Sequence, residues 1–498
     1  MLFEVLPDAL VATLLSDGLS ARTLAQVQRV CKRVIHVLMP LIKPLILQQT
    51  RGAMMTAARQ GETWLYRLHF AELQQTRKPS TISHGDASHA VCVRQDGVAF
   101  AWGYTDGFDS HEDRVELGAL GCGRDTGPCI ISPLAIVGMS NPVREVAAGL
   151  NHTLLLGNCG RVWSFGSKAA AECGALGHGV PPGASVRFGP SWEPDPITTG
   201  FYAVSTPRLI AAIAEGRMLQ VSAGRHHSVV LSAAGNVLVF GFSDCGELGD
   251  GSKGSGRYTP HMLAEPAHIR QVSAGANHSL AVGEEGELYV TGRNGGWLGQ
   301  ASKPDLLQFT LIPVAGVRFE QASAGERHSL ALSTEGALYS FGGECNCLGA
   351  PGPDGQFGGG PDGRAERGGR AEPMLVAFFA GNPVRSIATG SSHSVVLTAD
   401  GSVFTFGSNG IGQLGQGDRE PRLLPTEVTA LPGEVIEICT YMARLKSGEL
   451  RAWGDNGRGK LGIGVVPPPT GGTVGGYEAT LVLNPTKVEV PPPAPVVA

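Results

Sequence analysis

The chain has 498 residues, a net charge of −5 and only 17% charged residues, and 71 of its residues are glycine. This composition is typical of a turn-rich β protein and argues against a disordered chain. The acidic balance, without a Lys/Arg-rich tail, makes a nucleic-acid partner unexpected. Ten irregularly spaced cysteines favour a reducing compartment, so a cytoplasmic and/or nuclear location is expected. Neither a membrane span nor a secretion signal is predicted, because the longest apolar stretch (34–47) is broken by prolines and charged residues.

Residues 1–43 differ from the rest of the chain in being Leu/Val-rich and almost free of glycine. Leu6, Leu10 and Leu14 recur at helical spacing, and Ser20 is a suitable N-cap for a second helix. The pattern therefore predicts a small α-helical head. A helical connector is expected over residues 44–81, because that segment is not rich in Gly or Ser.

This head resembles an F-box, a family with a Leu-Pro-x-Glu/Asp start and a later Val-Cys-Lys-Arg segment. The matching residues are Leu6-Pro-Asp-Ala-Leu10 and Val30-Cys-Lys-Arg33. The resemblance implies that the head binds a Skp-type adaptor of a cullin ubiquitin ligase. Its adaptor-binding residues would be Leu6, Pro7, Leu10, Val30, Cys31 and Lys32. The alternative is a helical cap on the domain that follows.

From Ile82 onward one pattern recurs along the chain. A histidine is followed eight residues later by a glycine, and six residues after that by a second glycine. The histidines are His89, His152, His227, His278, His328 and His393, and the first glycines are Gly97, Gly160, Gly235, Gly286, Gly336 and Gly401. A seventh copy has Gly448 and Gly454 but lacks the histidine. Such a fixed internal period predicts a repeat architecture.

Each copy contains four short apolar runs. Two of them flank a glycine turn, as around Gly235, and predict a hairpin. A third run, led by proline, follows a Leu-Gly pair, and a fourth precedes the histidine; in the first copy Leu117-Gly118 or Leu120-Gly121 could supply that pair. Four strands per copy predict one blade, so residues 82–490 are predicted to form an all-β, seven-bladed β-propeller. The Pro-rich tail 491–498 is expected to be disordered.

The repeats resemble those of the regulator of chromosome condensation family, in Ala274–Ser279 (AGANHS), Leu338–Gly342 (LYSFG) and Gly412–Gly415 (GQLG). The resemblance implies the same propeller but does not fix a function, because one fold hosts many functions. Plant UV-B photoreceptors of this type carry tryptophans in Gly-Trp-Arg-His-Thr elements. The corresponding residues are Leu150, Arg225, Ala276, Glu326 and Ser391, so a photoreceptor is not expected.

Ring closure and long insertions complete the predicted organisation. The first repeat has only residues 77–81 before its histidine region, and these form a poor strand. The terminal run 485–490 is therefore predicted to pair beside repeat one and close the ring. Insertions at 104–116, 178–205 and 351–372 are candidates for binding, because loops on a rigid scaffold usually carry it. The third insertion is of low complexity, and Gly-rich disorder accounts for it equally well.

The six repeated histidines are predicted to be structural, each bonding a neighbouring backbone group. Metal ligands must converge on one point, whereas equivalent positions in a ring stand apart. A following serine points to the opposite face of its strand and cannot act with its histidine as a catalytic pair. The Cys345/Cys347 pair lacks partners for zinc. No catalytic residue, metal or cofactor is therefore predicted.

Three functions remain open from the sequence. The first is an F-box subunit whose propeller loops recruit a protein substrate to a cullin ligase, without enzymatic chemistry of its own. The second is a nucleotide-exchange factor for a Ran-like small GTPase, the activity of the founding member of the repeat family. The third is a propeller scaffold with no link to ubiquitin.

Overall fold

The computed structural model describes residues 79–85, 89–104, 120–123, 129–139, 141–184, 202–295, 298–299, 304–343, 345–350, 370–464 and 481–493. The chain divides into two compact units, Met1–Pro79 with Asn158–Gly160, and Ser80–Gly157 with Arg161–Ala498. All described strands belong to the second unit. The predicted F-box-like head and its connector lie outside the described residues, apart from residues 79–81.

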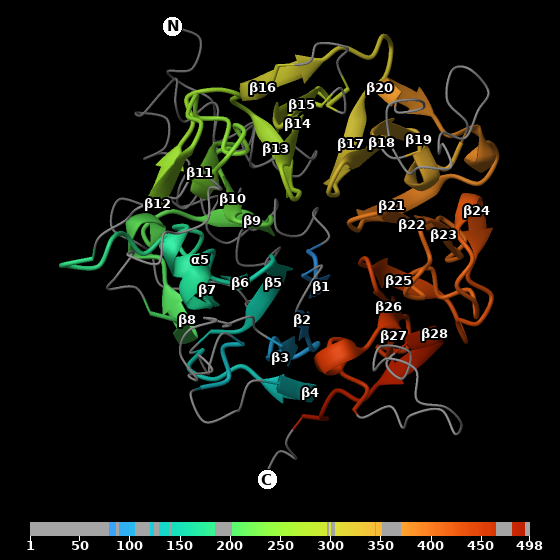
Figure 1. The fold of residues 1–498 in the computed structure, drawn as a ribbon, viewed down its shortest axis with the longest axis horizontal. Coiled ribbons are helices and arrows are strands. Elements are labelled where there is room, and N and C mark those ends of the chain that lie inside the picture. Colours follow the sequence, from blue (N-terminus) through green and yellow to red (C-terminus); the bar gives the residue numbers. More distant parts are fainter. Residues whose placement is uncertain are drawn as a thin grey trace, which may run out of the picture. The chain divides into compact units, whose positions relative to one another are not determined.

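The second unit is a seven-bladed β-propeller, as the sequence predicts. Seven antiparallel sheets of four consecutive strands each surround a central axis, with the first strand of every sheet innermost (Figure 1). Blade 1 comprises β1 (Ile82–His84), β2 (His89–Val93), β3 (Ala99–Tyr104) and β4 (Cys129–Ala135), and blade 2 comprises β5 (Val143–Ala148), β6 (His152–Gly157), β7 (Val162–Gly166) and β8 (Val204–Leu209). Blade 3 comprises β9 (Met218–Ala223), β10 (His227–Ser232), β11 (Val237–Ser243) and β12 (Ser255–Met262). Blade 4 comprises β13 (Ile269–Ala274), β14 (His278–Gly283), β15 (Leu288–Gly292) and β16 (Leu306–Ile312).

Blades 5 to 7 continue the same order around the ring. Blade 5 comprises β17 (Phe319–Ala324), β18 (His328–Ser333), β19 (Leu338–Gly342) and β20 (Arg370–Leu375). Blade 6 comprises β21 (Val384–Thr389), β22 (His393–Thr398), β23 (Val403–Gly407) and β24 (Arg422–Glu427). Blade 7 comprises β25 (Val435–Ile438), β26 (Met442–Leu445), β27 (Leu450–Asp455) and β28 (Leu481–Val488). The described helices are short: α5 (Lys168–Glu172), η1 (Ala211–Ile213), η2 (Cys345–Leu348), η3 (Ala377–Phe379) and η4 (Gly457–Gly459). Among the described residues, no helix has the length and apolar character needed to cross a membrane.

The prediction that the terminal run 485–490 pairs beside the first repeat is wrong. The terminal strand β28 pairs with β27 in blade 7, with Leu450 opposite Val488, and the first blade has its own inner strand, β1. The run that follows the Leu-Gly pair contains proline in every blade except the fourth. It is the outermost strand of its own blade and does not begin the next blade. Every blade is therefore one contiguous segment, so no sheet contains both ends of the chain.

Side chains close the ring where blade 7 meets blade 1. The Glu437 carboxylate on β25 accepts hydrogen bonds from the backbone N–H groups of Thr81 and Ile82 and from the Thr81 hydroxyl. The Arg444 Nε atom lies 3.3 Å from the same carboxylate, and its Nη2 atom donates to the Val93 carbonyl at 2.9 Å. Trp102 in blade 1 donates from Nε1 to the Lys460 carbonyl of blade 7 at 3.0 Å. These contacts replace the hydrogen-bonded strand pairing that the sequence predicts.

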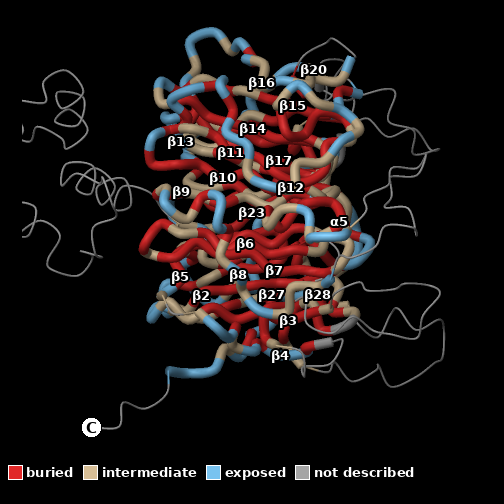
Figure 2. Tube along the Cα trace, turned by 90° about the vertical axis from the view of Figure 1, so that its left-hand side faces the viewer, coloured by how far each residue is buried: buried red, intermediate tan, exposed pale blue. Residues whose placement is uncertain are grey.

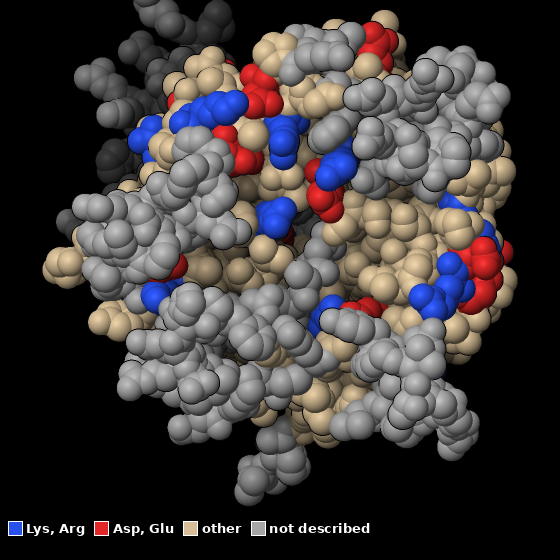
Figure 3. All heavy atoms as spheres, viewed as in Figure 1, with Lys and Arg blue, Asp and Glu red and all other residues tan. Residues whose placement is uncertain are grey.

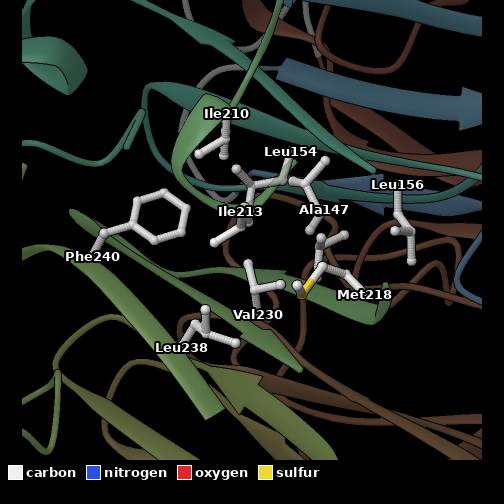
Figure 4. Close-up of a cluster of buried hydrophobic side chains, with 11 residues drawn as sticks. Ala147, Leu154, Leu156, Ile210, Ile213, Met218, Val230, Leu238 and Phe240 are labelled. Carbon is white, nitrogen blue, oxygen red and sulfur yellow. The ribbon is translucent and has the colours of Figure 1, made fainter. Parts of the chain in front are cut away.

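The hydrophobic core lies between adjacent blades. Between blades 2 and 3, for example, Leu154 and Leu156 of β6 pack with Val230 of β10 and Phe240 of β11, and all four are fully buried (Figure 4). The second strand of each blade alternates side chains toward its two neighbours. These strands are consequently buried along their whole length in blades 1 to 6, as in β10 and β14, whereas Arg444 of β26 is only partly buried. Burial of apolar area between blades, at roughly 25 cal/mol per Å², holds the ring together.

The two faces of the ring differ in the length of their connections. On one face, here called the loop face, lie the Gly-x-x-His loops and the connections from third to fourth strand. Four of those connections are long: residues 105–128, 167–203, 343–369 and 456–480. On the opposite turn face the longest connections between described strands are 210–217 and 376–383, eight residues each.

The chain enters and leaves the ring on the turn face. β1 runs antiparallel to β2 from Ile82 toward the loop face, and β28 runs away from the loop face to Val488. Figure 2 shows α5, which belongs to a loop-face connection, on the side of the ring away from the residues that follow β28. The loop face is thus free of the points where the chain joins the ring.

Candidate functional site at the mouth of the central channel

The six repeated histidines form a belt of hydrogen bonds between blades. In five of them Nε2 lies 2.7–3.0 Å from a hydroxyl of the next blade, and His393 contacts the Thr440 carbonyl at 2.8 Å. The hydroxyls belong to Thr153, Ser228, Ser279, Ser329 and Ser394. The predicted backbone partner is therefore present for His393, whereas the other five bond a side chain that follows the next histidine in sequence.

The direction of these hydrogen bonds follows from the single proton of a hydroxyl. Ser228, Ser279 and Ser394 each donate to a backbone carbonyl, those of Ala175, Glu247 and Cys347, at 2.8–2.9 Å. Each histidine that contacts one of these hydroxyls must therefore donate from Nε2. Because the serine proton is directed at a carbonyl and both side chains are buried, the His–Ser pairs cannot act as base and nucleophile.

Burial keeps the belt neutral. It lowers the pKa of His152, His227 and His328 to about 3 and the pKa of His89, His278 and His393 to about 4. The charged imidazole is disfavoured because the interior replaces water with apolar neighbours. These side chains hold blades together, and solvent does not reach them.

The glycines of the repeat have steric duties around the histidine. A Cβ at Gly224 would lie 2.4 Å from His227 Cε1, and a Cβ at Gly241 would lie 2.5 Å from His227 Cα. Both positions therefore require glycine. The glycines between the second and third strands have φ from +76° to +92°, which favours the same residue. They are Gly97, Gly160, Gly235, Gly286, Gly336, Gly401 and Gly448.

The Leu-Gly pair of each repeat meets an aromatic side chain of the following blade. A Cβ at Gly121 would lie 2.9 Å from Phe165, and one at Gly177 would lie 2.9 Å from Phe240. Leu120, which precedes Gly121, is buried. Leu120-Gly121 therefore supplies the pair in the first repeat, and Leu117-Gly118 lies outside the described residues.

A central channel opens on the loop face. Its cavity has a volume of about 340 Å³ and is lined by the Gly-x-x-His loops and the adjoining ends of the inner strands. The five positions that carry tryptophan in plant UV-B photoreceptors all lie in this lining. They are Leu150, Arg225, Ala276, Glu326 and Ser391. The sequence marks these positions as variable within the repeat, but only the ring geometry brings them to one cavity.

The channel wall is asymmetric. Blades 2 to 5 contribute the small residues Ala148, Ala223, Ala274 and Ala324, each followed by a glycine. Blades 6, 7 and 1 contribute Thr389, Thr440 and His84 instead. Among the described residues, neither His84 ring nitrogen nor the Thr440 hydroxyl has a hydrogen-bond partner, although all three atoms are buried. Sequence reasoning missed these two residues, because His84 and Thr440 lie outside the positions that carry histidine in the repeat.

Charged side chains border the channel mouth. Arg225 lines the cavity, and Arg293, Glu326 and Arg327 line a shallow depression beside it. Figure 3 shows Lys and Arg side chains around the central hollow of this face. Backbone hydrogen bonds from Arg225 to the Gly275 carbonyl (3.2 Å) and from Arg293 to the Asn277 carbonyl (2.8 Å) fix where these residues sit. The site therefore has the features of a binding surface on a rigid scaffold.

The six predicted adaptor-binding residues, Leu6 to Lys32, lie outside the described residues and stay predictions. The predicted loop insertions correspond to connections from the third to the fourth strand, whose described ends are on the loop face. Of the Cys345/Cys347 pair, only the Cys347 side chain is described, and it is buried. Its backbone carbonyl belongs to the hydrogen-bonded belt.

Seven contiguous four-stranded blades, joined by a histidine belt and Leu-Gly contacts, define a propeller of the regulator of chromosome condensation class. The RCC1-like domain profile matches residues 171–498. The chain belongs to the RCC1-like domain family, and its propeller is an interaction module.

Similar proteins include the ultraviolet-B receptor UVR8 of Arabidopsis thaliana, 30% identical over 330 residues, which cover 64% of this chain and 66% of that protein. The E3 ubiquitin-protein ligase HERC2 of Homo sapiens is 28% identical over 382 residues, or 74% of this chain and 7% of that protein. The chain thus spans less than two thirds of each of these relatives.

Among solved structures, Prp20p of Saccharomyces cerevisiae, described with its binding to Gsp1p and histones, aligns with a TM-score of 0.60. It is 22% identical and the alignment covers 84% of this chain and 89% of Prp20p. At this identity the likeness establishes the fold alone.

Proposed function

We propose that this protein is the substrate-recruiting F-box subunit of a cullin-based ubiquitin ligase and that its loop face binds the protein substrate. The observation that carries the proposal is the separation of the two faces of the ring. The long connections and the channel mouth share one face, whereas the chain joins the ring at Ser80 and leaves it after Val488 on the other.

The head and the propeller would have separate roles, and together they would bring the substrate close to the ligase. The head, through Leu6, Pro7 and Leu10 with Val30, Cys31 and Lys32, would bind a Skp-type adaptor. The propeller would hold a substrate near the catalytic subunit of the ligase, which raises its effective concentration without chemistry at the propeller. The ubiquitin-ligase relative HERC2 supports this proposal, since a similar propeller occurs there within a ligase.

The test is co-purification of the full chain with a Skp-type adaptor at micromolar concentrations of both. We expect the wild type to retain the adaptor and the Leu6→Ala/Pro7→Ala double variant to lose it. The propeller should unfold at the same urea concentration in both proteins. A wild type that never retains the adaptor refutes the ligase proposal and favours a scaffold.

A Ran-like GTPase serves as the discriminating second ligand. Retention of its nucleotide-free form, together with faster nucleotide release, would identify an exchange factor instead. Under our proposal the full chain changes the rate of nucleotide release by less than twofold. This measurement is independent of the adaptor experiment.

A further inference from the structure

The wall of the central channel has a polar part and an apolar part. The neighbouring blades 6, 7 and 1 contribute Thr389, Thr440 and His84 to the lining. Blades 2 to 5 contribute four small apolar residues, Ala148, Ala223, Ala274 and Ala324. Side chains on one side of the cavity can therefore form hydrogen bonds, while the other side can pack against an aliphatic group.

Two of the three polar side chains present unused hydrogen-bonding groups to the cavity. His84 and Thr440 are each 8% exposed, and neither the His84 ring nitrogens nor the Thr440 hydroxyl has a partner in the part of the chain that the structure describes. Thr389 differs, because its hydroxyl lies 2.8 Å from the hydroxyl of Ser323. The belt uses only the backbone of Thr440, since His393 donates to the Thr440 carbonyl. Buried polar atoms are normally satisfied by protein, water or a ligand, so these two side chains mark a place where a ligand can bind.

His84 is fixed in position and uncharged. Its ring packs against the ring of Tyr441, the residue that follows Thr440, with the two centroids 4.5 Å apart. Burial lowers the pKa of the His84 imidazole to about 3, and the charge of Lys460 acts in the same direction. The Gly85 backbone opposes this shift but lies outside hydrogen-bonding geometry. At neutral pH the imidazole therefore offers one donor and one acceptor.

These two side chains favour a neutral ligand that both donates and accepts hydrogen bonds. An uncharged imidazole and a hydroxyl each have a donor and an acceptor. A carboxylate would only accept and an ammonium group would only donate, so each would leave buried polar atoms unsatisfied. A carboxamide carries a carbonyl oxygen and an NH₂ group in one plane, and it can therefore bond His84 of blade 1 and Thr440 of blade 7 at the same time.

We propose that the channel binds the carboxamide side chain of a glutamine or asparagine of the partner protein, with His84 and Thr440 as its hydrogen-bonding partners. The aliphatic part of that side chain packs against the alanines of the opposite wall. The cavity opens on the loop face, and its volume of about 340 Å³ is in the range of ligand pockets. The inference rests on the proposed binding of a protein at this face and specifies the group that this protein inserts into the channel.

The test is a nuclear magnetic resonance titration of the full chain, with its histidines isotopically labelled at Cε1. The His84 signal is the one that disappears in His84→Phe, a variant that keeps a ring beside Tyr441 but has no ring nitrogen. The probes are short acetylated and amidated glycine–serine peptides with a central glutamine, asparagine, glutamate or norleucine. Norleucine has no hydrogen-bonding group in its side chain, and all four peptides have the same backbone amides. We expect a saturable shift of the His84 signal, with the tighter carboxamide peptide binding at least tenfold more tightly than the glutamate and norleucine peptides.

Matched variants locate the binding in the channel. Thr440→Val removes the hydroxyl with little change of shape and should weaken the preferred peptide at least tenfold. Thr310→Val, on the outer strand β16, is its control and should change the affinity less than twofold. His84→Phe should also weaken the peptide at least tenfold, measured by saturation transfer to the peptide, whereas His261→Phe, at an exposed residue of β12, should not.

The urea midpoint separates a binding role from a structural one. Thr440→Val and His84→Phe remove buried polar groups that have no partner among the described residues, so neither variant should unfold at a lower urea concentration than the wild type. Residues that merely hold the ring together would lower the midpoint when replaced. A lower midpoint with unchanged peptide affinity would therefore assign His84 and Thr440 a structural role and overturn the proposal.

Other results would also overturn it: no shift of the His84 signal at millimolar peptide, equal affinity for the carboxamide and norleucine peptides, or equal losses in Thr440→Val and Thr310→Val. Saturation of the His84 signal by glucose but by none of the peptides would assign the channel to a carbohydrate instead. Failure of the inference is separable from failure of the proposed function, because retention of the adaptor is measured independently. If the full chain retains the adaptor but prefers neither carboxamide peptide, only the chemistry of the channel is refuted.

Discussion

Glu437 on β25 accepts hydrogen bonds from the backbone and hydroxyl of Thr81, a residue 356 positions earlier in the chain. At the same register, Gln220, Gln271 and Gln321 bond the inner strand of the next blade. The junction of blades 7 and 1 thus uses a carboxylate, paired with Arg444, where these other junctions use an amide.

Removal of this carboxylate should destabilise the ring. We expect Glu437→Ala to lower the free energy of unfolding by about 2–4 kcal/mol, because Arg444 is then buried without its partner. Glu437→Gln should cost less, since an amide oxygen can still accept from Thr81. Urea unfolding followed by tryptophan fluorescence measures both. Glu434→Gln, in an exposed pair with Lys446, is the control, and an equal loss there would contradict the role of Glu437.

The histidine belt makes a second stability prediction. His278→Ala removes the hydrogen bond to Ser329 and leaves a cavity, which should cost about 2–4 kcal/mol of unfolding free energy. His268→Ala, at an exposed residue of the turn face, should change stability by less than about 0.5 kcal/mol. Similar urea midpoints for the two variants would argue against a structural belt.

Acid should destabilise the propeller above the pH range in which carboxylates of ordinary pKa titrate. Glu247 is the exception, because burial raises its pKa to about 7. Burial lowers the pKa of the belt histidines from 6.5 to about 3 or 4, so the unfolded chain binds more protons than the folded one below about pH 6.5. The contribution of these neutral histidines to the free energy of unfolding is fully present above pH 6.5. It falls as the pH drops toward 4, by up to about 1.4 kcal/mol per pH unit for each histidine. Urea midpoints at three pH values in this window measure the slope. A midpoint that stays constant between pH 7 and 5 would contradict the assignment of neutral histidines.

Gly462 and Gly464 form a matched pair at the closing junction. Both have positive φ, +69° and +78°, but a Cβ at Gly462 would lie 2.7 Å from Trp102 Nε1, whereas one at Gly464 meets no atom within 4 Å. Gly464→Ala should therefore cost only the backbone strain, about 1 kcal/mol, and Gly462→Ala at least about 2 kcal/mol. The difference in thermal midpoint between the variants reports the steric part. Equal losses of stability in the two variants would show that the Trp102 side chain can move aside at no cost in free energy.

Deletion of the last strand tests the corrected ring closure. Removal of residues 481–498 takes β28 from β27, exposes the edge of that sheet and removes the buried side chains of Val482 and Val488 from the core. We expect aggregation or loss of cooperative unfolding, measured by light scattering and circular dichroism. Removal of residues 494–498 alone should leave both signals unchanged.

The sequence predicts the seven blades, because the spacing of histidine and glycine is fixed by contacts inside each repeat. A Cβ at Gly241 would collide with His227 of the neighbouring strand, so the sequence records a local steric rule. The sequence does not determine in the same way which four consecutive strands form one blade. From the sequence, a proline-containing strand such as Arg422–Glu427 could end one blade or begin the next, and only its pairing with β23 decides between them.

The candidate site was less accessible to sequence reasoning. Arg225 and Glu326 occupy variable positions of separate repeats, and their shared cavity depends on the curvature of the ring. His84 lies five residues before the repeat histidine His89, so no periodic signal marked it. Thr153 was equally hidden, since its role as a hydrogen-bond partner belongs to the preceding blade.

Each long connection of the loop face begins and ends in the same sheet, as residues 167–203 do between β7 and β8. Its length can change without altering the spacing of blades or the circumference of the ring. Sequence changes in these connections are thereby independent of sequence changes in the strands of the ring. Each of the seven blades has one such connection, so the same propeller can change its loop face by insertions alone.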